Sequence, residues 1–210
     1  MKYTDLKEQF PNIHEVVAVS KTFDCESIQH VFNDGFRHFG ENKVQELISK
    51  KDCNDQIIWH FIGHLQSNKV KDVVKIARWI DSVDSTKLLD LINKECMKIN
   101  KVMNILIQVK LTNEDSKSGL DPILLNDTLA YTRTLTHIKC LGLMIIGPNT
   151  DNSDVIRSTF KQAKQLLEDT QKKYPEMTEL SMGMSHDYSI AYEEGSTIFR
   201  IGSLLFGQRR

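Results

Sequence analysis

Short apolar runs rich in β-branched residues recur eight times along the chain, and a segment of helical period separates each run from the next. Strands that alternate with helices are typical of parallel sheets, because each parallel pair needs a crossover connection. The predicted strands are VVAVS (16–20), FRHFG (36–40), IIWHFIG (57–63), RWIDSVD (78–84), NILIQVKL (104–111), KCLGLMIIG (139–147), ELSMGM (179–184) and TIFRIGSLLFG (197–207). Eight such alternations predict an α/β fold, a (β/α)8 barrel of the TIM type.

The segments between the strands carry helix signals. Cys25, Ile28 and Phe32 fall on one helical face, and Gly35 follows them as a stop. Asp121 precedes a proline and then an apolar periodic segment, which is typical of a capping residue at a helix start. These signals support the alternation of strands and helices.

A single domain over residues 1–210 is expected, because no linker rich in Gly, Ser or Pro divides the chain. Little sequence follows the eighth strand, so we expect residues 2–10 to supply the remaining helix from the N-terminus. The alternative is an open α/β sheet, in which the run at 36–40 is not a strand. That run is the weakest of the eight, since it contains Arg37 and His38.

The charge balance is nearly even, with 27 Lys and Arg residues against 28 Asp and Glu residues. Such a chain lacks the basic field that holds nucleic acid or anionic lipid, so we expect no nucleic-acid partner. The N-terminal stretch MKYTDLKEQF has no signal-peptide character, and no run approaches the ~20 apolar residues of a membrane span. We therefore expect a cytoplasmic protein without a membrane partner that acts on a small molecule.

The four cysteines, Cys25, Cys53, Cys96 and Cys140, are scattered along the chain. They form no C-x-x-C pair, and their spacing suggests neither a metal clip nor a disulfide framework. A reducing compartment fits this pattern. His60 and His64 stand four residues apart without an intervening glutamate, so the zinc-helix motif is not met and no metal is expected.

A lysine ends the first apolar run, VVAVSK at 16–21. In a (β/α)8 barrel the functional groups lie at the C-terminal ends of the strands, so Lys21 is expected at the mouth of the barrel. A partly desolvated lysine has a lowered pKa, and its neutral amine can attack an aldehyde to form a Schiff base. The simpler interpretation is a lysine that reaches into water.

The seventh and eighth strand ends predict a phosphate site. Ser185 lies at the start of a short helical segment, where backbone N–H groups attract anions. The stretch FRIGS adds Arg200, Gly202 and Ser203. Ser185 could instead be an ordinary N-cap and Gly202 a strand bend, but a buried Arg200 must find a partner. An amine beside a phosphate cradle suggests pyridoxal 5′-phosphate.

Seven stretches resemble, in order, the pyridoxal phosphate homeostasis protein family. They are AVSKTF (18–23), FGENKVQE (39–46), WHFIGHLQSNK (59–69), DSKSGL (115–120), GLM (142–144), SMGMSHD (181–187) and GSTIFRIGSLLFG (195–207). This resemblance covers nearly the whole chain. It implies a barrel like the N-terminal domain of alanine racemase, without the racemase's second domain, that holds one pyridoxal phosphate.

The resemblance also implies roles for individual residues. Lys21 matches the Schiff-base lysine, and Arg200 matches the arginine near the pyridine nitrogen. A fixed positive charge there disfavours protonation of the ring and weakens the electron sink on which carbanion chemistry depends.

The remaining matches concern the phosphate and one neighbouring position. Ser185, Gly202 and Ser203 match the phosphate-binding positions, although the family more often has threonine where Ser203 stands. Asn42, in the FGEN motif, lies beside the cofactor site without an assigned role. His186 replaces an acidic or small residue that is more usual in the family.

The function implied is a non-catalytic one. We expect a monomer that holds pyridoxal phosphate as a Schiff base on Lys21 and buffers it or delivers it to apoenzymes, maintaining vitamin B6 balance. A racemase also needs an acid/base group on the opposite face of the substrate. In the related racemase, the resemblance implies that this group is a tyrosine from the second domain. The alternatives are a weak amino-acid racemase and a barrel for another phosphate metabolite, in which Lys21 has no covalent role.

Overall fold

Eight parallel strands form a closed barrel in the computed structural model, which describes residues 1–112 and 118–207. Each strand pairs with the next, and the last pairs with the first. The strands are β1 (Glu15–Val19), β2 (His38–Glu41), β3 (Ile58–Phe61), β4 (Trp79–Val83), β5 (Met103–Gln108), β6 (Ile138–Met144), β7 (Glu179–Ser181) and β8 (Ile198–Ile201). The predicted (β/α)8 barrel is confirmed, and the open-sheet alternative is wrong.

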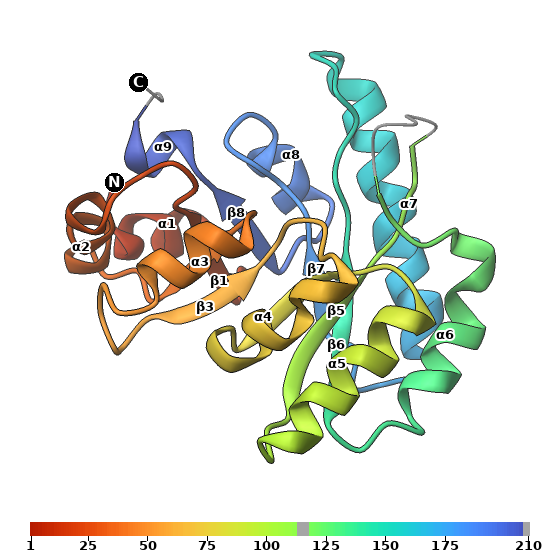
Figure 1. The fold of residues 1–210 in the computed structure, drawn as a ribbon. Helices are drawn as coiled ribbons and strands as arrows, with labels where there is room; N and C mark the ends of the chain where they lie inside the picture. The colour runs from red at the N-terminus through yellow and green to blue at the C-terminus, as the bar shows by residue number, and fades with distance from the viewer. Residues whose placement is uncertain (113–117, 208–210) are drawn as a thin grey trace.

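Helices connect successive strands and surround the barrel (Figure 1). They are α1 (Tyr3–Gln9), α2 (Cys25–Asn33), α3 (Val44–Lys50), η1 (Ser67–Lys69), α4 (Val70–Ile76), α5 (Thr86–Lys98), η2 (Pro122–Leu124), α6 (Leu125–Thr132), α7 (Ser153–Gln171), α8 (Tyr188–Glu193) and α9 (Ser203–Phe206), with η1 and η2 being 3-10 turns. In the described ranges, none of these helices is both long and apolar enough to cross a membrane.

The predicted helix signals act as expected. Helix α2 buries Ile28 and Phe32 against the barrel and ends just before Gly35, whose φ of +104° is a left-handed conformation that glycine adopts readily. The Asp121 carboxylate accepts a hydrogen bond from the Ile123 N–H and so starts η2.

The predicted N-terminal helix is also present as α1. Phe10, at its C-terminal end, packs edge-on against Phe199 of β8 and Tyr192 of α8, with ring centroids 5.4 and 4.9 Å away. Phe10 therefore packs the end of this N-terminal segment against the last strand and the helix before it.

Strand β1 is buried on both faces, as expected for a parallel strand covered by helices. Val16 belongs to the main core between strands and helices. Val17, on the opposite face, packs in a smaller cluster with Leu106, Met144 and Ile198, which come from β5, β6 and β8. Strand β1 is therefore held by packing on both faces up to its C-terminal end.

Most strands are shorter than the runs predicted for them, and the difference is largest at β8. The run at 197–207 was predicted as strand throughout, but β8 ends at Ile201 and the next turn folds into α9. The N–H groups of Leu205 and Phe206 both donate to the Gly202 carbonyl, so the backbone changes to helical bonding there. The run at 179–184 also ends early, at Ser181, and Gly183 beyond it has a φ of +94°.

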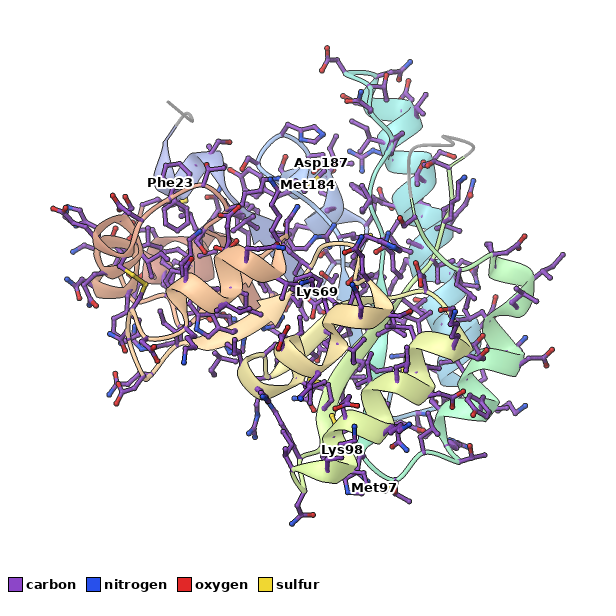
Figure 2. The ribbon with its side chains drawn as sticks, viewed as in Figure 1. Phe23, Lys69, Met97, Lys98, Met184 and Asp187 are labelled. Carbon is purple, nitrogen blue, oxygen red and sulfur yellow. A yellow bond between two sulfur atoms is a disulfide. The ribbon has the colours of Figure 1, made fainter. Side chains whose placement is uncertain are left out.

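One cysteine prediction is wrong. Cys25, at the start of α2, forms a disulfide with Cys53, which follows α3 (Figure 2). The two residues are 28 positions apart, and the barrel brings their Cα atoms to 5.3 Å. Cys96 and Cys140 are free and buried. The cysteine pattern therefore no longer supports a reducing compartment.

Candidate functional site

A cavity of about 440 Å³ opens at the C-terminal ends of the strands. Its volume lies in the usual range for small-molecule sites. All six residues predicted to bind the cofactor line it: Lys21, Asn42, Ser185, Arg200, Gly202 and Ser203. The structure thus brings together groups from four strand ends, those of β1, β2, β7 and β8.

The fold positions Lys21 through β1. The strand is buried up to Val19, Ser20 is also buried, and Lys21 is the first partly exposed residue beyond them. Because all eight strands are parallel, this residue emerges at the same edge as the ends of β7 and β8. The lysine predicted at the mouth of the barrel therefore lies in the cavity wall.

Arg200 finds the partners that its burial demands. Its side chain donates from Nη1 to the Ser181 Oγ at 2.7 Å and from Nη2 to the Ile145 carbonyl at 2.8 Å. Burial lowers the pKa of the guanidinium, and the negative charges of Asp81 and Asp187 oppose that shift. An arginine remains protonated in proteins, so the cavity wall carries a fixed positive charge.

Ser185 and Gly202 join the loops that follow β7 and β8. The Gly202 N–H donates to the Ser185 Oγ at 3.3 Å. A Cβ added to Gly202 would meet only Val19, at 3.5 and 3.7 Å, which are ordinary contacts. A side chain at this position would therefore fit the protein and take space at the cavity wall.

Ser185 is not the N-cap of α8. That position belongs to Asp187, whose Oδ1 accepts a hydrogen bond from the Met184 N–H at 2.6 Å. His186 lines the cavity with a half-exposed side chain, and its Nε2 lies 3.3 Å from the Asp187 Oδ2. The Ser185 hydroxyl is consequently directed to Gly202 rather than to the helix.

The other walls of the cavity are apolar. They consist mainly of Val19, Phe23, Ile62, Met144, Ile146 and Met184. The Phe23 ring stacks on Phe206, with centroids 4.9 Å apart. Sequence reasoning missed these residues because nothing in the sequence separates an apolar cavity wall from the core; only their positions near strand ends could have suggested it.

His60 and His64, for which no metal site was predicted, lie in different surroundings. His60 lies inside the barrel, with its Nδ1 3.0 Å from the Asp81 Oδ2, whereas His64 is exposed and lies near Asp84. Among the described residues, no group of three or more His, Cys, Asp or Glu side chains could hold a metal ion.

The chain matches the family model described as "Alanine racemase, N-terminal domain" over residues 2–210. It is 41% identical to the pyridoxal phosphate homeostasis protein of Aquifex aeolicus over 202 residues, which cover 95% of this chain and 89% of the relative. The chain belongs to the pyridoxal phosphate homeostasis protein family. The family member of Schizosaccharomyces pombe is 35% identical over 92% of this chain and 84% of its own.

Solved structures agree with this membership. PipY of Synechococcus elongatus, solved with pyridoxal phosphate bound, is 36% identical, covers 97% of both chains and superposes with a TM-score of 0.91. An alanine racemase of Clostridium difficile shares the fold, with 11% identity and a TM-score of 0.76 over 100% of this chain and 61% of its own. Of the motifs that carry the family resemblance, residues 115–117 lie outside the described residues.

Proposed function

We propose that this protein binds one pyridoxal phosphate in the cavity, joins it to the Lys21 amine as a Schiff base, and stores or delivers it without catalysing a reaction. The observation that carries the proposal is the convergence of an amine, a fixed cation and anion-binding groups on one cavity. A relative of the same length and fold holds this cofactor. Pyridoxal phosphate supplies an aldehyde, an aromatic ring and a phosphate.

The residues of the cavity fit these three parts. The Lys21 Nζ would bond to the aldehyde carbon, and the apolar walls formed by Ile62 and Met144 suit an aromatic ring. Ser185 and Gly202 offer a hydroxyl and a backbone N–H, already close together, to the phosphate. The open space at Gly202 allows a ligand to approach the backbone closely.

Ser203 and Asn42 complete the set of predicted binding residues. Ser203 begins α9 next to Gly202, so its hydroxyl is available on the same side of the cavity. Asn42 lines the cavity after β2, and we assign it no specific contact.

Arg200 supports storage rather than catalysis. Its two hydrogen bonds hold the guanidinium in the cavity wall, where we assign it to the ring nitrogen. A cation at that position opposes protonation of the ring and so weakens its capacity to accept electrons.

We further propose that the protein is a cytoplasmic monomer that passes the cofactor to apoenzymes.

Reduction with borohydride tests the covalent part of the proposal. The protein is incubated with pyridoxal phosphate, reduced and digested, and the modified peptide is located by mass spectrometry. We expect a pyridoxyl adduct on Lys21 and none in the Lys21→Ala variant. Tight binding without an adduct on Lys21 would instead favour a barrel for phosphate metabolites in which the lysine has no covalent role.

A further inference from the structure

Two side chains of α3, Glu46 and Lys50, hold the backbone on either side of Lys21. The Glu46 Oε2 accepts a hydrogen bond from the Thr22 N–H at 2.6 Å, and the Lys50 Nζ donates one to the Ser20 carbonyl at 2.9 Å. That carbonyl belongs to the peptide group before Lys21, and that N–H to the peptide group after it. One turn of one helix therefore binds both peptide groups that flank the Lys21 Cα.

The backbone next to Lys21 is strained. Thr22 has a φ of +72°, in the left-handed region that β-branched residues rarely adopt. Such a conformation persists only where surrounding contacts enforce it, and residues of this kind cluster at functional sites. The hydrogen bond to Glu46 is one such contact, and the bond from the Phe23 N–H to the Ser20 carbonyl, at 3.0 Å, closes the turn.

The two holding side chains are themselves fixed. Lys50 is 7% exposed, and its Nζ lies 2.8 Å from both the Glu46 Oε2 and the Glu41 Oε1. Glu41 is fully buried and also accepts a hydrogen bond from the Ser20 Oγ at 2.7 Å. A buried cation with three oxygen partners in this arrangement has little freedom to move.

The Glu46 carboxyl group is ionised although it is partly buried. Burial opposes ionisation, but the hydrogen bonds from Lys50 and the Thr22 N–H together lower the pKa of the carboxyl group. The bond to Thr22 is therefore a charge-assisted one, which is stronger than a bond between neutral groups.

We propose that Glu46 and Lys50 are positioning residues, which fix the strained turn so that the Lys21 amine enters the cavity where the covalent bond forms. The inference rests on the proposed function. Neither side chain lines the cavity, so both act through the backbone of Lys21.

A comparison of two ligands tests this role. Pyridoxine 5′-phosphate has an alcohol where pyridoxal phosphate has an aldehyde, so it can use the ring and phosphate contacts but cannot bond to an amine. The ratio of the two dissociation constants therefore reports what Lys21 contributes. We would measure both constants for the wild-type protein and for the Glu46→Ala, Lys50→Met and Lys21→Ala variants.

In Glu46→Ala and Lys50→Met, we expect the preference for pyridoxal phosphate over its alcohol analogue to fall about tenfold, as loss of one charge-assisted hydrogen bond implies. Affinity for the alcohol analogue should stay within about twofold of the wild type, because the phosphate-binding residues are untouched. Glu168→Ala is the matched control. It removes an i,i+4 pair with Lys164 on the exposed surface of α7 and should leave both constants unchanged.

Equal loss of affinity for both ligands would overturn the proposal, since it would show a general structural role. An unchanged preference in both variants would overturn it as well. If Glu46→Ala does not fold, Glu46→Gln serves instead, because its amide oxygen can still accept the bond from Thr22; we expect a smaller fall of the same kind. Wild-type preference in Lys21→Ala would show that the proposed covalent function itself is wrong.

Discussion

The Nδ1 atom of His38 lies 2.8 Å from the Nε2 atom of His60 inside the barrel. The pair continues on both sides, since the His60 Nδ1 lies 3.0 Å from the Asp81 Oδ2 and the His38 Nε2 lies 3.2 Å from the Glu15 Oε2. Two ring nitrogens at this distance can share only one proton. Burial, and then the charge of His60, lower the pKa of His38 to about 3.

This pair predicts a loss of stability in acid. The unfolded chain protonates His38 near pH 6.5, whereas the folded protein does so only near pH 3, so acid favours the unfolded state between these values. The wild-type free energy of unfolding should fall by up to about 3 kcal/mol more than that of His38→Gln between pH 7 and pH 4. Urea denaturation at several pH values measures this difference.

The comparison with His38→Gln is needed because Glu15 changes the stability of the folded protein with pH in the opposite direction. Burial raises the pKa of Glu15, so the folded protein holds that proton better and gains stability as the pH falls. The variant keeps Glu15, and this contribution largely cancels. If the free energies of unfolding of the two proteins changed with pH in parallel, a buried neutral His38 would be ruled out.

Removal of the charge on Arg200 should release catalytic activity. In Arg200→Gln the cation assigned to the ring nitrogen is gone, so bound pyridoxal phosphate becomes a stronger electron acceptor. We expect exchange of the Cα hydrogen of L-alanine with deuterated water to rise at least about tenfold over the wild type. Proton NMR measures the exchange. Rapid exchange and racemisation by the wild-type protein would instead show that it is a racemase.

Gly202→Ala should weaken cofactor binding while leaving the fold intact. The new methyl group meets only ordinary contacts with Val19, so the free energy of unfolding should change by less than about 1 kcal/mol. It also takes space beside the Gly202 N–H, so the dissociation constant for pyridoxal phosphate should rise about tenfold or more. Absorbance titration and thermal unfolding of the ligand-free variant give the two values. Unchanged affinity would remove Gly202 from the phosphate site.

Reduction of the Cys25–Cys53 disulfide should destabilise the protein. A cross-link between cysteines 28 positions apart contributes about 3 to 4 kcal/mol through the unfolded chain. Urea denaturation with and without dithiothreitol measures the loss. The Cys25→Ser/Cys53→Ser double variant is the control and should show no effect of the reductant. A wild-type midpoint that does not move would indicate that the bond does not form in solution.

The barrel could be predicted because each strand is an apolar run, and the site because parallel strands end on one edge. The run at 197–207 shows the limit of this reasoning: SLLF is as apolar as the strand before it, and only the turn at Gly202 makes it helical. His38 made β2 look weak, although the barrel supplies partners for it in Glu15 and His60.

Contacts between polar residues far apart in the chain could not be predicted from the sequence, for a related reason. Glu46 and Lys50 read as an ordinary i,i+4 pair on a helix, and nothing in their spacing shows that both reach the backbone at Lys21. The same is true of Cys25 and Cys53, whose proximity depends on how α2 and α3 pack.

The pairing of β1 with β8 places the candidate site across the seam of the barrel. Val17 lies opposite Arg200 in this pairing, and Lys21 and Gly202 follow the two strands at the same edge. The residue proposed to bond the cofactor and two of those proposed to hold its phosphate, Gly202 and Ser203, thus follow the first and last strands of the barrel. If these residues hold the cofactor, a ribosome-bound chain that lacks β8 lacks part of the site, so only the closed barrel would bind the cofactor, and the bound cofactor would link the first strand to the last.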